Sequence, residues 1–325
     1  MMKADELMRF IENSPCILGE GAVIERLRRE SSFELDPFIV NSAFIYDEYK
    51  RDALEKIYLQ YMDTGYEFDL PLLVSTPTWR ASKTRIKDAG YEKYDVNADN
   101  FRFLDGLRKS YGEYGKKIIV CGLMSCKGDA YISEEALRIE EARTFHLWQA
   151  RKLSASGVDF ILASTLPALG EAKGLALALA DTGKPYIISF IVRSQGTLLD
   201  GTPLHQAIAE IDALASPKPL AFIINCTHAS FARAALMHDT NSSPMVRKRI
   251  IGLLANTAAL SPEDLNNCKD LVEEDPAAFG KSVAEFNNTP GLKILGGCCG
   301  TDERHIRALA SELAASIENV GNGEK

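Results

Sequence analysis

Short apolar segments alternate with longer amphipathic segments along the whole chain. Several of the short segments are apolar at every position, such as YIISFIV over Tyr186–Val192 and LAFIIN over Leu220–Asn225. Strands of this kind are covered on both faces, as in parallel sheets. Eight such segments are candidate strands: Cys16–Gly19, Leu70–Ser75, Lys117–Leu123, Val158–Ser164, Pro185–Val192, Leu220–Cys226, Arg249–Asn256 and Leu292–Gly297.

Helix signals fall between the candidate strands. A segment with helical periodicity begins at Ser133 and ends near Gly157. Thr202-Pro203 and Asp275-Pro276 each place a capping residue before a proline at the first helical position. Thr301 is predicted to cap the last helix of the chain.

Eight alternations of strand and helix predict an α/β fold, a (β/α)8 TIM barrel that forms a single domain over residues 1–325. A chain of 325 residues suits one barrel with insertions, and no linker or low-complexity tract divides it. The alternative is an open, doubly wound sheet. It is weakened because no glycine-rich dinucleotide fingerprint follows a candidate strand.

Composition and charge argue against several classes of partner. The chain is 46% hydrophobic and 25% charged, and its net charge of −8 comes without a basic stripe. This argues against nucleic acid or an anionic membrane as a partner.

Charges interrupt the N-terminal sequence MMKADELMRFIENSP, and no apolar run reaches about 18 residues, so neither a signal peptide nor a membrane span is expected. We therefore expect a cytoplasmic protein whose seven cysteines stay reduced.

Three cysteines fall at predicted strand ends. Cys298 and Cys299 follow the last candidate strand, and Cys226 ends the sixth. The carboxyl ends of barrel strands form the catalytic face. The glycines of GGCCGT (Gly296–Thr301) would let both adjacent sulfurs turn toward one point, which a regular strand forbids. Three converging thiolates suit Zn²⁺, with the fourth coordination position open for a substrate.

Packing is the competing interpretation for cysteine. A lone buried cysteine usually acts as a small hydrophobic residue. We apply this interpretation to Cys16, Cys121, Cys126 and Cys268, and it would also hold for Cys226 taken alone. For the adjacent pair, the residues alone leave packing and metal binding open.

Two motifs resemble those of the homocysteine S-methyltransferase family: GGCCGT, and NCT over Asn225–Thr227. The family includes betaine–homocysteine and S-methylmethionine–homocysteine methyltransferases and the homocysteine module of cobalamin-dependent methionine synthase. Weaker similarities over Tyr58–Ser82, Ser164–Ala172 and Leu253–Ala258 extend the resemblance from about residue 15 to residue 313.

The resemblance implies a zinc-dependent S-methyltransferase whose ligands are Cys226, Cys298 and Cys299. Such an enzyme moves a methyl group from a sulfonium, betaine-like or corrinoid donor to a thiol, and homocysteine would give methionine. The expected partners are therefore a small-molecule thiol and a methyl donor, with a separate corrinoid protein as one source of the methyl group. Trp79 and Phe44 are candidates, by position alone, to contact a cationic donor. The sequence leaves the oligomeric state open.

The segments that bind the amino acid depart from the family pattern. The first strand usually ends in Asp-Gly-Gly, where this chain has Gly19-Glu20-Gly21. The fourth strand usually carries Glu-Thr, where this chain has Ser164 and Thr165. A serine cannot neutralise the ammonium of homocysteine as that glutamate does. Glu20 or Glu171 is expected to compensate, although a solvated charge on a helix is an equal alternative for Glu171.

Two asparagines at strand ends, Asn225 and Asn256, complete the candidate site. They are expected to bind ligand sulfurs or the substrate carboxylate, or else to satisfy loop backbone. Three other functions stay open, the first two because the amino-acid-binding segments differ and the third only if the sheet is open, which the missing nucleotide fingerprint disfavours. These are methyl transfer to a thiol without an amine, a non-catalytic zinc-binding or corrinoid-docking protein, and an oxidoreductase on an open sheet.

Overall fold

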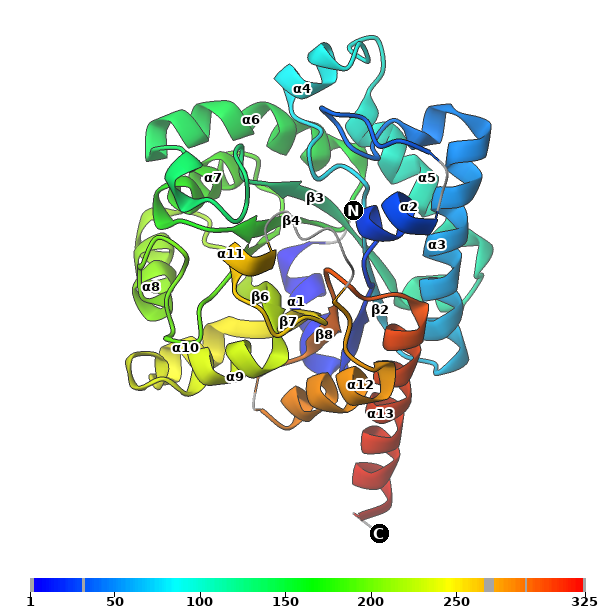
Figure 1. The fold of residues 1–325 in the computed structure, drawn as a ribbon, viewed down its shortest axis with the longest axis vertical. Coiled ribbons are helices and arrows are strands. Elements are labelled where there is room, and N and C mark those ends of the chain that lie inside the picture. The colour runs from blue at the N-terminus through cyan, green and yellow to red at the C-terminus, as the bar shows by residue number, and fades with distance from the viewer. Residues whose placement is uncertain (1–2, 31–32, 266–271, 290, 324–325) are drawn as a thin grey trace.

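The computed structural model describes residues 3–30, 33–265, 272–289 and 291–323. Parallel strands form one closed barrel in the order β1 to β8 (Figure 1). The strands are β1 (Ile17–Gly19), β2 (Leu72–Ser75), β3 (Ile118–Ser125), β4 (Phe160–Leu166), β5 (Tyr186–Phe190), β6 (Ala221–His228), β7 (Ile250–Asn256) and β8 (Ile294–Gly297). Every strand overlaps one predicted segment, and the prediction of a (β/α)8 barrel is confirmed.

Most helices surround the barrel, whereas α1 lies behind its centre and α11 lies over its near face in Figure 1. The helices are α1 (Ala4–Asn13), α2 (Ile24–Glu30), α3 (Glu48–Glu67), α4 (Lys83–Asp88), α5 (Val96–Ser110), α6 (Ile139–Ser156), α7 (Leu169–Ala180), α8 (Leu204–Leu214), α9 (Ala229–Met237), α10 (Pro244–Arg249), α11 (Pro262–Leu265), α12 (Pro276–Ala284) and α13 (Glu303–Gly323).

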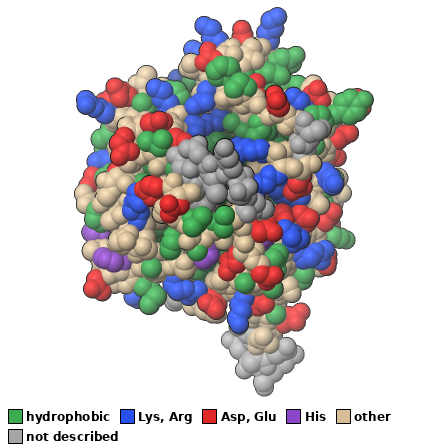
Figure 2. All heavy atoms as spheres, in the orientation of Figure 1, with side chains coloured by type: hydrophobic (Ala, Val, Ile, Leu, Met, Phe, Trp, Pro, Cys, Tyr) green, Lys and Arg blue, Asp and Glu red, His purple; other side chains and the backbone are tan. Residues whose placement is uncertain are grey.

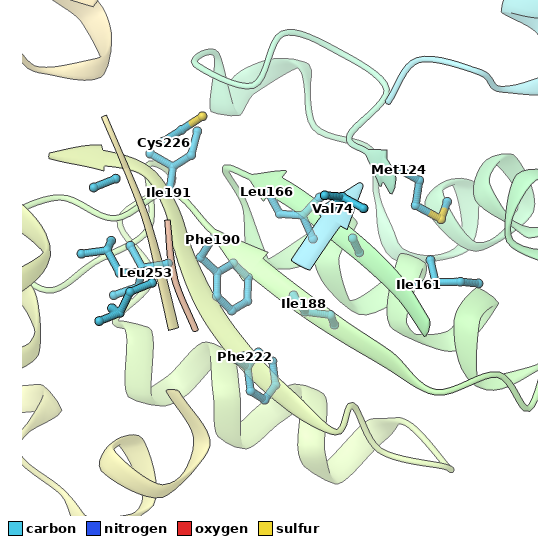
Figure 3. Packing of buried hydrophobic residues seen from close by; sticks show 14 of the residues in the cluster. Val74, Met124, Ile161, Leu166, Ile188, Phe190, Ile191, Phe222, Cys226 and Leu253 are labelled. Carbon is cyan, nitrogen blue, oxygen red and sulfur yellow. The ribbon is translucent and has the colours of Figure 1, made fainter. Parts of the chain in front are cut away.

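The apolar side chains form an outer and an inner core. The outer core joins the strands to the surrounding helices, and Figure 3 shows part of it, with Phe222 and Cys226 toward opposite ends of β6. The inner core fills the barrel. It includes Leu7 and Ile11 of α1, which are almost fully buried against strand residues such as Ile119. Alternate positions of each strand therefore serve the two cores, which is why the strands are apolar throughout.

The barrel closes where β1 pairs with β8, and a glycine is required there. Ile17 pairs with Ile294, and Leu18 pairs with Leu295. One residue further on, a β-carbon at Gly296 would lie 2.6 Å from the Cα of Gly19. Because this is closer than β-carbons approach other atoms, a side chain at position 296 would push the two strands apart. The sequence GG before the cysteine pair is therefore part of the barrel closure.

The helix predictions were partly right. Asp275 caps α12 by accepting hydrogen bonds from the backbone of Ala277 and Ala278, as predicted. The segment predicted to be helical from Ser133 is helical only from Ile139, after a short 3-10 turn and an extended stretch. Its end at Gly157, which adopts a positive φ of 111°, is confirmed.

Two predicted caps are wrong. Thr202 does not cap α8, because Pro203 itself takes the extended N-cap conformation and the helix begins at Leu204. Thr301 does not cap α13, because its hydroxyl donates to the backbone oxygen of Cys298. Asp302 accepts the backbone N–H of Arg304 instead.

Across the described parts of the chain, no helix combines the length and the apolar character needed to cross a bilayer.

Candidate active site

A cavity of about 460 Å³ lies at the carboxyl ends of the strands. Its volume falls within the range of small-molecule sites, about 300–1,000 Å³. Figure 2 views this end of the barrel, where Lys and Arg side chains gather beside the centre of the face. All eight candidate residues line this one cavity: Glu20, Ser164, Thr165, Asn225, Cys226, Asn256, Cys298 and Cys299.

The three cysteine sulfurs meet in this cavity. Sγ of Cys226 lies 2.7 Å from Sγ of Cys298 and 3.9 Å from Sγ of Cys299. All three sulfurs lie within 4.8 Å of one another. Zinc–sulfur bonds of about 2.3 Å place tetrahedral ligands roughly 3.8 Å apart. The longer separation matches that value, and the shorter one would open by about 1 Å around an ion.

Unusual backbone geometry directs Cys226 into the cavity. Its φ is 49°, in the left-handed region that few non-glycine residues adopt, and the pairing of β6 with β7 shifts between Asn225 and Thr227. Thr165 on β4 has a φ of 62°, also beside a register shift. Asn225 links the two irregularities, because its Oδ1 accepts the backbone N–H of Thr165 and its Nδ2 donates to the Thr165 hydroxyl. Strained backbone of this kind is typical of functional sites.

The cysteine pair is held by the end of β7 and by a left-handed glycine. Oδ1 of Asn256 accepts the backbone N–H of Cys299 at 3.1 Å. Gly300 has a φ of 83°, and a β-carbon there would collide with the hydroxyl of Thr257. Glycine is therefore required after the pair, as the sequence suggested. Asn256 keeps its Nδ2 buried and without a hydrogen-bond partner among the described residues.

The three thiols are electrostatically coupled. Hydrogen bonds from Cys226 and Cys299 lower the pKa of Cys298 well below its usual value. Hydrogen bonding to Cys298 raises the pKa of Cys226 well above its usual value. The cluster therefore holds one negative charge readily, whereas three thiolates at this spacing need a cation among them. Three soft sulfur donors fit zinc, and a metal that binds them would hold all three deprotonated.

Glu20 faces the cavity at the end of β1, with one carboxylate oxygen unused. Its Oε1 accepts the backbone N–H of Ser75 at 3.0 Å. Its Oε2 is buried and has no hydrogen-bond partner in the described part of the chain. Burial raises the pKa of Glu20 to about 8, although the hydrogen bonding of Ser75 opposes the shift. A cationic group in the cavity would therefore find a carboxyl group able to ionise and to pair with it.

Ser164 belongs to a buried network of neutral groups. Its hydroxyl lies 3.1 Å from that of Thr165, and Asn225 joins the same network. Both the oxygen and the nitrogen of the Asn225 amide form hydrogen bonds within the protein. Of its two predicted roles, the structure therefore shows hydrogen bonding to the backbone rather than contact with a ligand. No carboxylate is part of this network, so a substrate ammonium near Ser164 would gain no ion pair from it.

Glu171 is not available to a substrate, and the expectation that it compensates for Ser164 is wrong. It is fully buried in α7 and does not line the cavity. Its Oε1 accepts the backbone N–H of Lys127, and its Oε2 accepts that of Leu137. The alternative of a solvated helix charge is also wrong. Helix periodicity could not reveal this, because its partners come from a distant loop.

Tyr131 is a site residue that the sequence analysis missed. It lines the cavity from the segment between β3 and α6, and its side chain lies beside those of Cys299 and Asn256. Glu25 was also missed; its Oε2 accepts the backbone N–H of Gly300. The available signal for Tyr131 was an aromatic residue soon after the third strand, at the catalytic face.

The two aromatic candidates for contact with a cationic donor have different positions. Trp79 lines the cavity, but the guanidinium of Arg80 already lies over its ring at 4.3 Å from the centroid. Phe44 is 2% exposed and belongs to the outer core, so its candidacy is wrong. Position along the chain indicates that a residue is near a strand end but not the direction in which its ring points.

The other described cysteines are packing residues, as expected. Cys16, Cys121 and Cys126 are buried, and burial raises the pKa of each. Cys268 lies outside the described residues.

Comparisons with known proteins show the family of this chain. The family model described as homocysteine S-methyltransferase matches residues 17–313. Betaine–homocysteine S-methyltransferase 1 of Pongo abelii is 22% identical over 322 residues, covering 92% of this chain and 72% of that protein. Methionine synthase of Mycobacterium leprae is 26% identical over 334 residues, covering 95% of this chain but 25% of that protein.

A solved structure has the same fold. The metallated form of the homocysteine methyltransferase MmuM from Escherichia coli superposes with a TM-score of 0.73 at 19% identity. The match covers 94% of this chain and 99% of that one.

Proposed function

The chain belongs to the homocysteine S-methyltransferase family, and from this premise we propose that it methylates homocysteine to methionine at a zinc ion. The proposed ligands are Cys226, Cys298 and Cys299. The observation that carries the proposal is the convergence of these three sulfurs, within 4.8 Å of one another, in the wall of a cavity at the catalytic end of the barrel.

The donor set supports zinc and an open coordination position. Three cysteine sulfurs and no histidine form the described cluster, and zinc accepts such ligands in tetrahedral geometry. When bound, zinc would hold the acceptor sulfur as a thiolate at neutral pH, although a free thiol has a pKa of about 8.5. The chain itself needs no general base at the transferred methyl group. Its residues orient the acceptor and keep the ligand sulfurs in place.

Glu20 is the proposed partner of the homocysteine ammonium. Its Oε2, which has no hydrogen-bond partner among the residues that the structure describes, is buried at the cavity wall, and Ser75 fixes the orientation of the carboxyl group. Pairing with an ammonium would favour the ionised form of Glu20 and offset its burial. Nδ2 of Asn256, which is also buried and has no hydrogen-bond partner among the described residues, is the proposed donor to the substrate carboxylate.

The size and charge of the cavity favour a small methyl donor. Arg28, Arg29 and Arg80 line it, whereas the carboxylates of Glu25 and Asp129 already accept backbone hydrogen bonds. Guanidinium groups bind carboxylates well. A sulfonium or betaine-like molecule that carries a carboxylate fits this lining. A methyl group delivered by a separate corrinoid protein is the alternative, and it would approach through the open end of the barrel.

The test is a methyl-transfer screen that crosses thiols with donors. Reduced, zinc-loaded protein is incubated with homocysteine, 4-mercaptobutanoate or 3-mercaptopropanoate. The donors are S-methylmethionine, glycine betaine or a methylated corrinoid protein. The proposal predicts methylation of homocysteine, with a small onium donor. Transfer to the amine-free thiols alone would show that the acceptor is a thiol without an ammonium group. The absence of a carboxylate at Ser164 would then be explained. An absence of methyl transfer for every pair would refute the function.

A further inference from the structure

The segment between β3 and α6, residues 127–137, crosses the edge of the cavity and is held at both ends by one carboxylate. Oε1 of Glu171 accepts the backbone N–H of Lys127 at 2.7 Å. Oε2 of the same carboxylate accepts the backbone N–H of Leu137 at 3.0 Å. One buried side chain of α7 therefore fixes where this segment starts and where it ends.

A histidine fixes the carboxylate in turn. Nε2 of His146 lies 2.8 Å from Oε1 of Glu171, and the two side chains are 1% and 0% exposed. Burying a carboxylate is costly unless its oxygens are hydrogen-bonded, and here both are. The three contacts leave Glu171 little freedom to move. Because Glu171 is fixed, both ends of the segment that it binds are fixed as well.

Hydrogen bonds within the segment fix its backbone around Tyr131. Oε2 of Glu135 accepts the backbone N–H of Asp129 at 2.8 Å. Oδ1 of Asp129 accepts the backbone N–H of Tyr131, also at 2.8 Å. The Tyr131 ring packs on the outer core together with Cys298 and Cys299, and it lines the cavity.

From this geometry we propose that Glu171 is a positioning residue of the active site. It holds residues 127–137 so that the Tyr131 side chain stays beside Cys299 in the cavity wall, where its hydroxyl would donate a hydrogen bond to the ligand sulfur. The inference rests on the proposed zinc site, because the role of this hydrogen bond is to keep Cys299 oriented as a ligand. Groups that orient metal ligands typically change metal affinity or activity by about 10- to 100-fold when they are removed.

A double-mutant cycle on the zinc-loaded protein tests the chain of contacts. Tyr131→Phe, Glu171→Gln and the double variant are mixed with a chromogenic zinc chelator, and the rate of zinc release is followed. Each single variant should release zinc about tenfold faster than the unmodified protein. Because Glu171 acts through Tyr131, the double variant should release zinc no faster than Tyr131→Phe alone. KM and kcat for methyl transfer are measured in parallel.

Matched controls separate positioning from general destabilisation. Tyr111→Phe removes a tyrosine hydroxyl that bonds to Asp63, and Glu210→Gln weakens a partly buried ion pair with Lys173. Neither should alter zinc release. If Glu171→Gln fails to fold, Tyr131→Phe still decides the matter, because it leaves every hydrogen bond of Glu171 intact. Hydrogen exchange at Lys127 and Leu137 in that variant should stay slow.

The outcomes distinguish this inference from the function on which it rests. Unmodified protein that binds no zinc overturns both. Unmodified protein that binds zinc, together with a Tyr131→Phe variant that releases it at the same rate, overturns this inference and leaves the proposed function standing. Rate increases that multiply in the double variant overturn the positioning role of Glu171.

Discussion

The backbone N–H of Ser75 donates a hydrogen bond to Oε1 of Glu20 across the neighbouring strands β1 and β2, at 3.0 Å. With the carboxyl group in this orientation, the second oxygen, Oε2, is buried and has no hydrogen-bond partner among the described residues. Burial raises the pKa of Glu20 to about 8, so the group is mostly protonated at neutral pH when the cavity holds no cation. The arrangement prepares a carboxyl group that ionises when an ammonium arrives.

Replacement of Glu20 by Gln should therefore impair the use of homocysteine. We expect kcat/KM to fall by about tenfold or more, which corresponds to roughly 1.4 kcal/mol of lost pairing. Initial rates over a range of homocysteine concentrations measure the change.

The matched control for Glu20→Gln is a substrate. In 4-mercaptobutanoate the ammonium of homocysteine is absent, so the variant and the unmodified protein should use it equally well. Equal loss with both thiols would mean that Glu20 supports the fold of the site rather than the ammonium. If the variant uses homocysteine as well as the unmodified protein does, Glu20 does not bind the ammonium and does not compensate for the serine at position 164.

The same variant should change how stability depends on pH. The pKa of Glu20 is about 8 in the folded protein against an ordinary value of 4.5 for a glutamate in the unfolded chain, so the folded state binds the extra proton between these values. Raising the pH through this window costs the unmodified protein up to about 1.4 kcal/mol per pH unit at this group. Glu20→Gln should match the unmodified protein near pH 4.5 and exceed its free energy of unfolding at pH 8. Urea unfolding at both pH values measures the difference, and a pH-independent difference would contradict the shift.

Asn225 should be a stability residue. Asn225→Ala removes the acceptor of the buried Thr165 N–H and the donor to its hydroxyl. A buried donor left unsatisfied costs about 1–3 kcal/mol, so we expect a total loss of about 2–4 kcal/mol in the free energy of unfolding. Asn225→Asp keeps the acceptor and should lose less. If Asn225→Ala is as stable as the unmodified protein, its hydrogen bonds do not maintain the left-handed conformations of Thr165 and Cys226.

Removal of zinc should expose the cysteines to oxidation. Without a metal, the low pKa of Cys298 leaves a reactive thiolate beside two further sulfurs. Air and a chelator together should inactivate the protein through disulfides between Cys226 and the cysteine pair. Reductant with zinc should restore activity. Activity that survives chelation would show that zinc is not catalytic.

The barrel and the cysteine cluster were predictable because their signals are local. Each strand is a short apolar run, and the positions of Cys226, Cys298 and Cys299 at strand ends place them at one face of any such barrel. The glycines around the pair report the close packing of Gly296 on Gly19 and the left-handed turn at Gly300.

The surroundings of the cluster could not be predicted in the same way. The roles of Glu171 and Tyr131 depend on a contact between α7 and the segment before α6, which no spacing in the sequence encodes. The late start of α6 has the same origin, because Glu171 binds the Leu137 N–H in an extended stretch before the helix. Thr301 could not be assigned either, since its hydroxyl bonds to Cys298 and to Ala22 in the first loop.

Zinc content is the most direct test of the central claim. Elemental analysis of freshly purified, reduced protein should find about one zinc per chain. A variant with Cys298 and Cys299 replaced by Ser should contain none and should not methylate homocysteine. Cys16→Ala, which alters a buried cysteine of the outer core, should keep the metal. Unmodified protein without zinc, or a double variant that retains it, would contradict the assignment of the three cysteines.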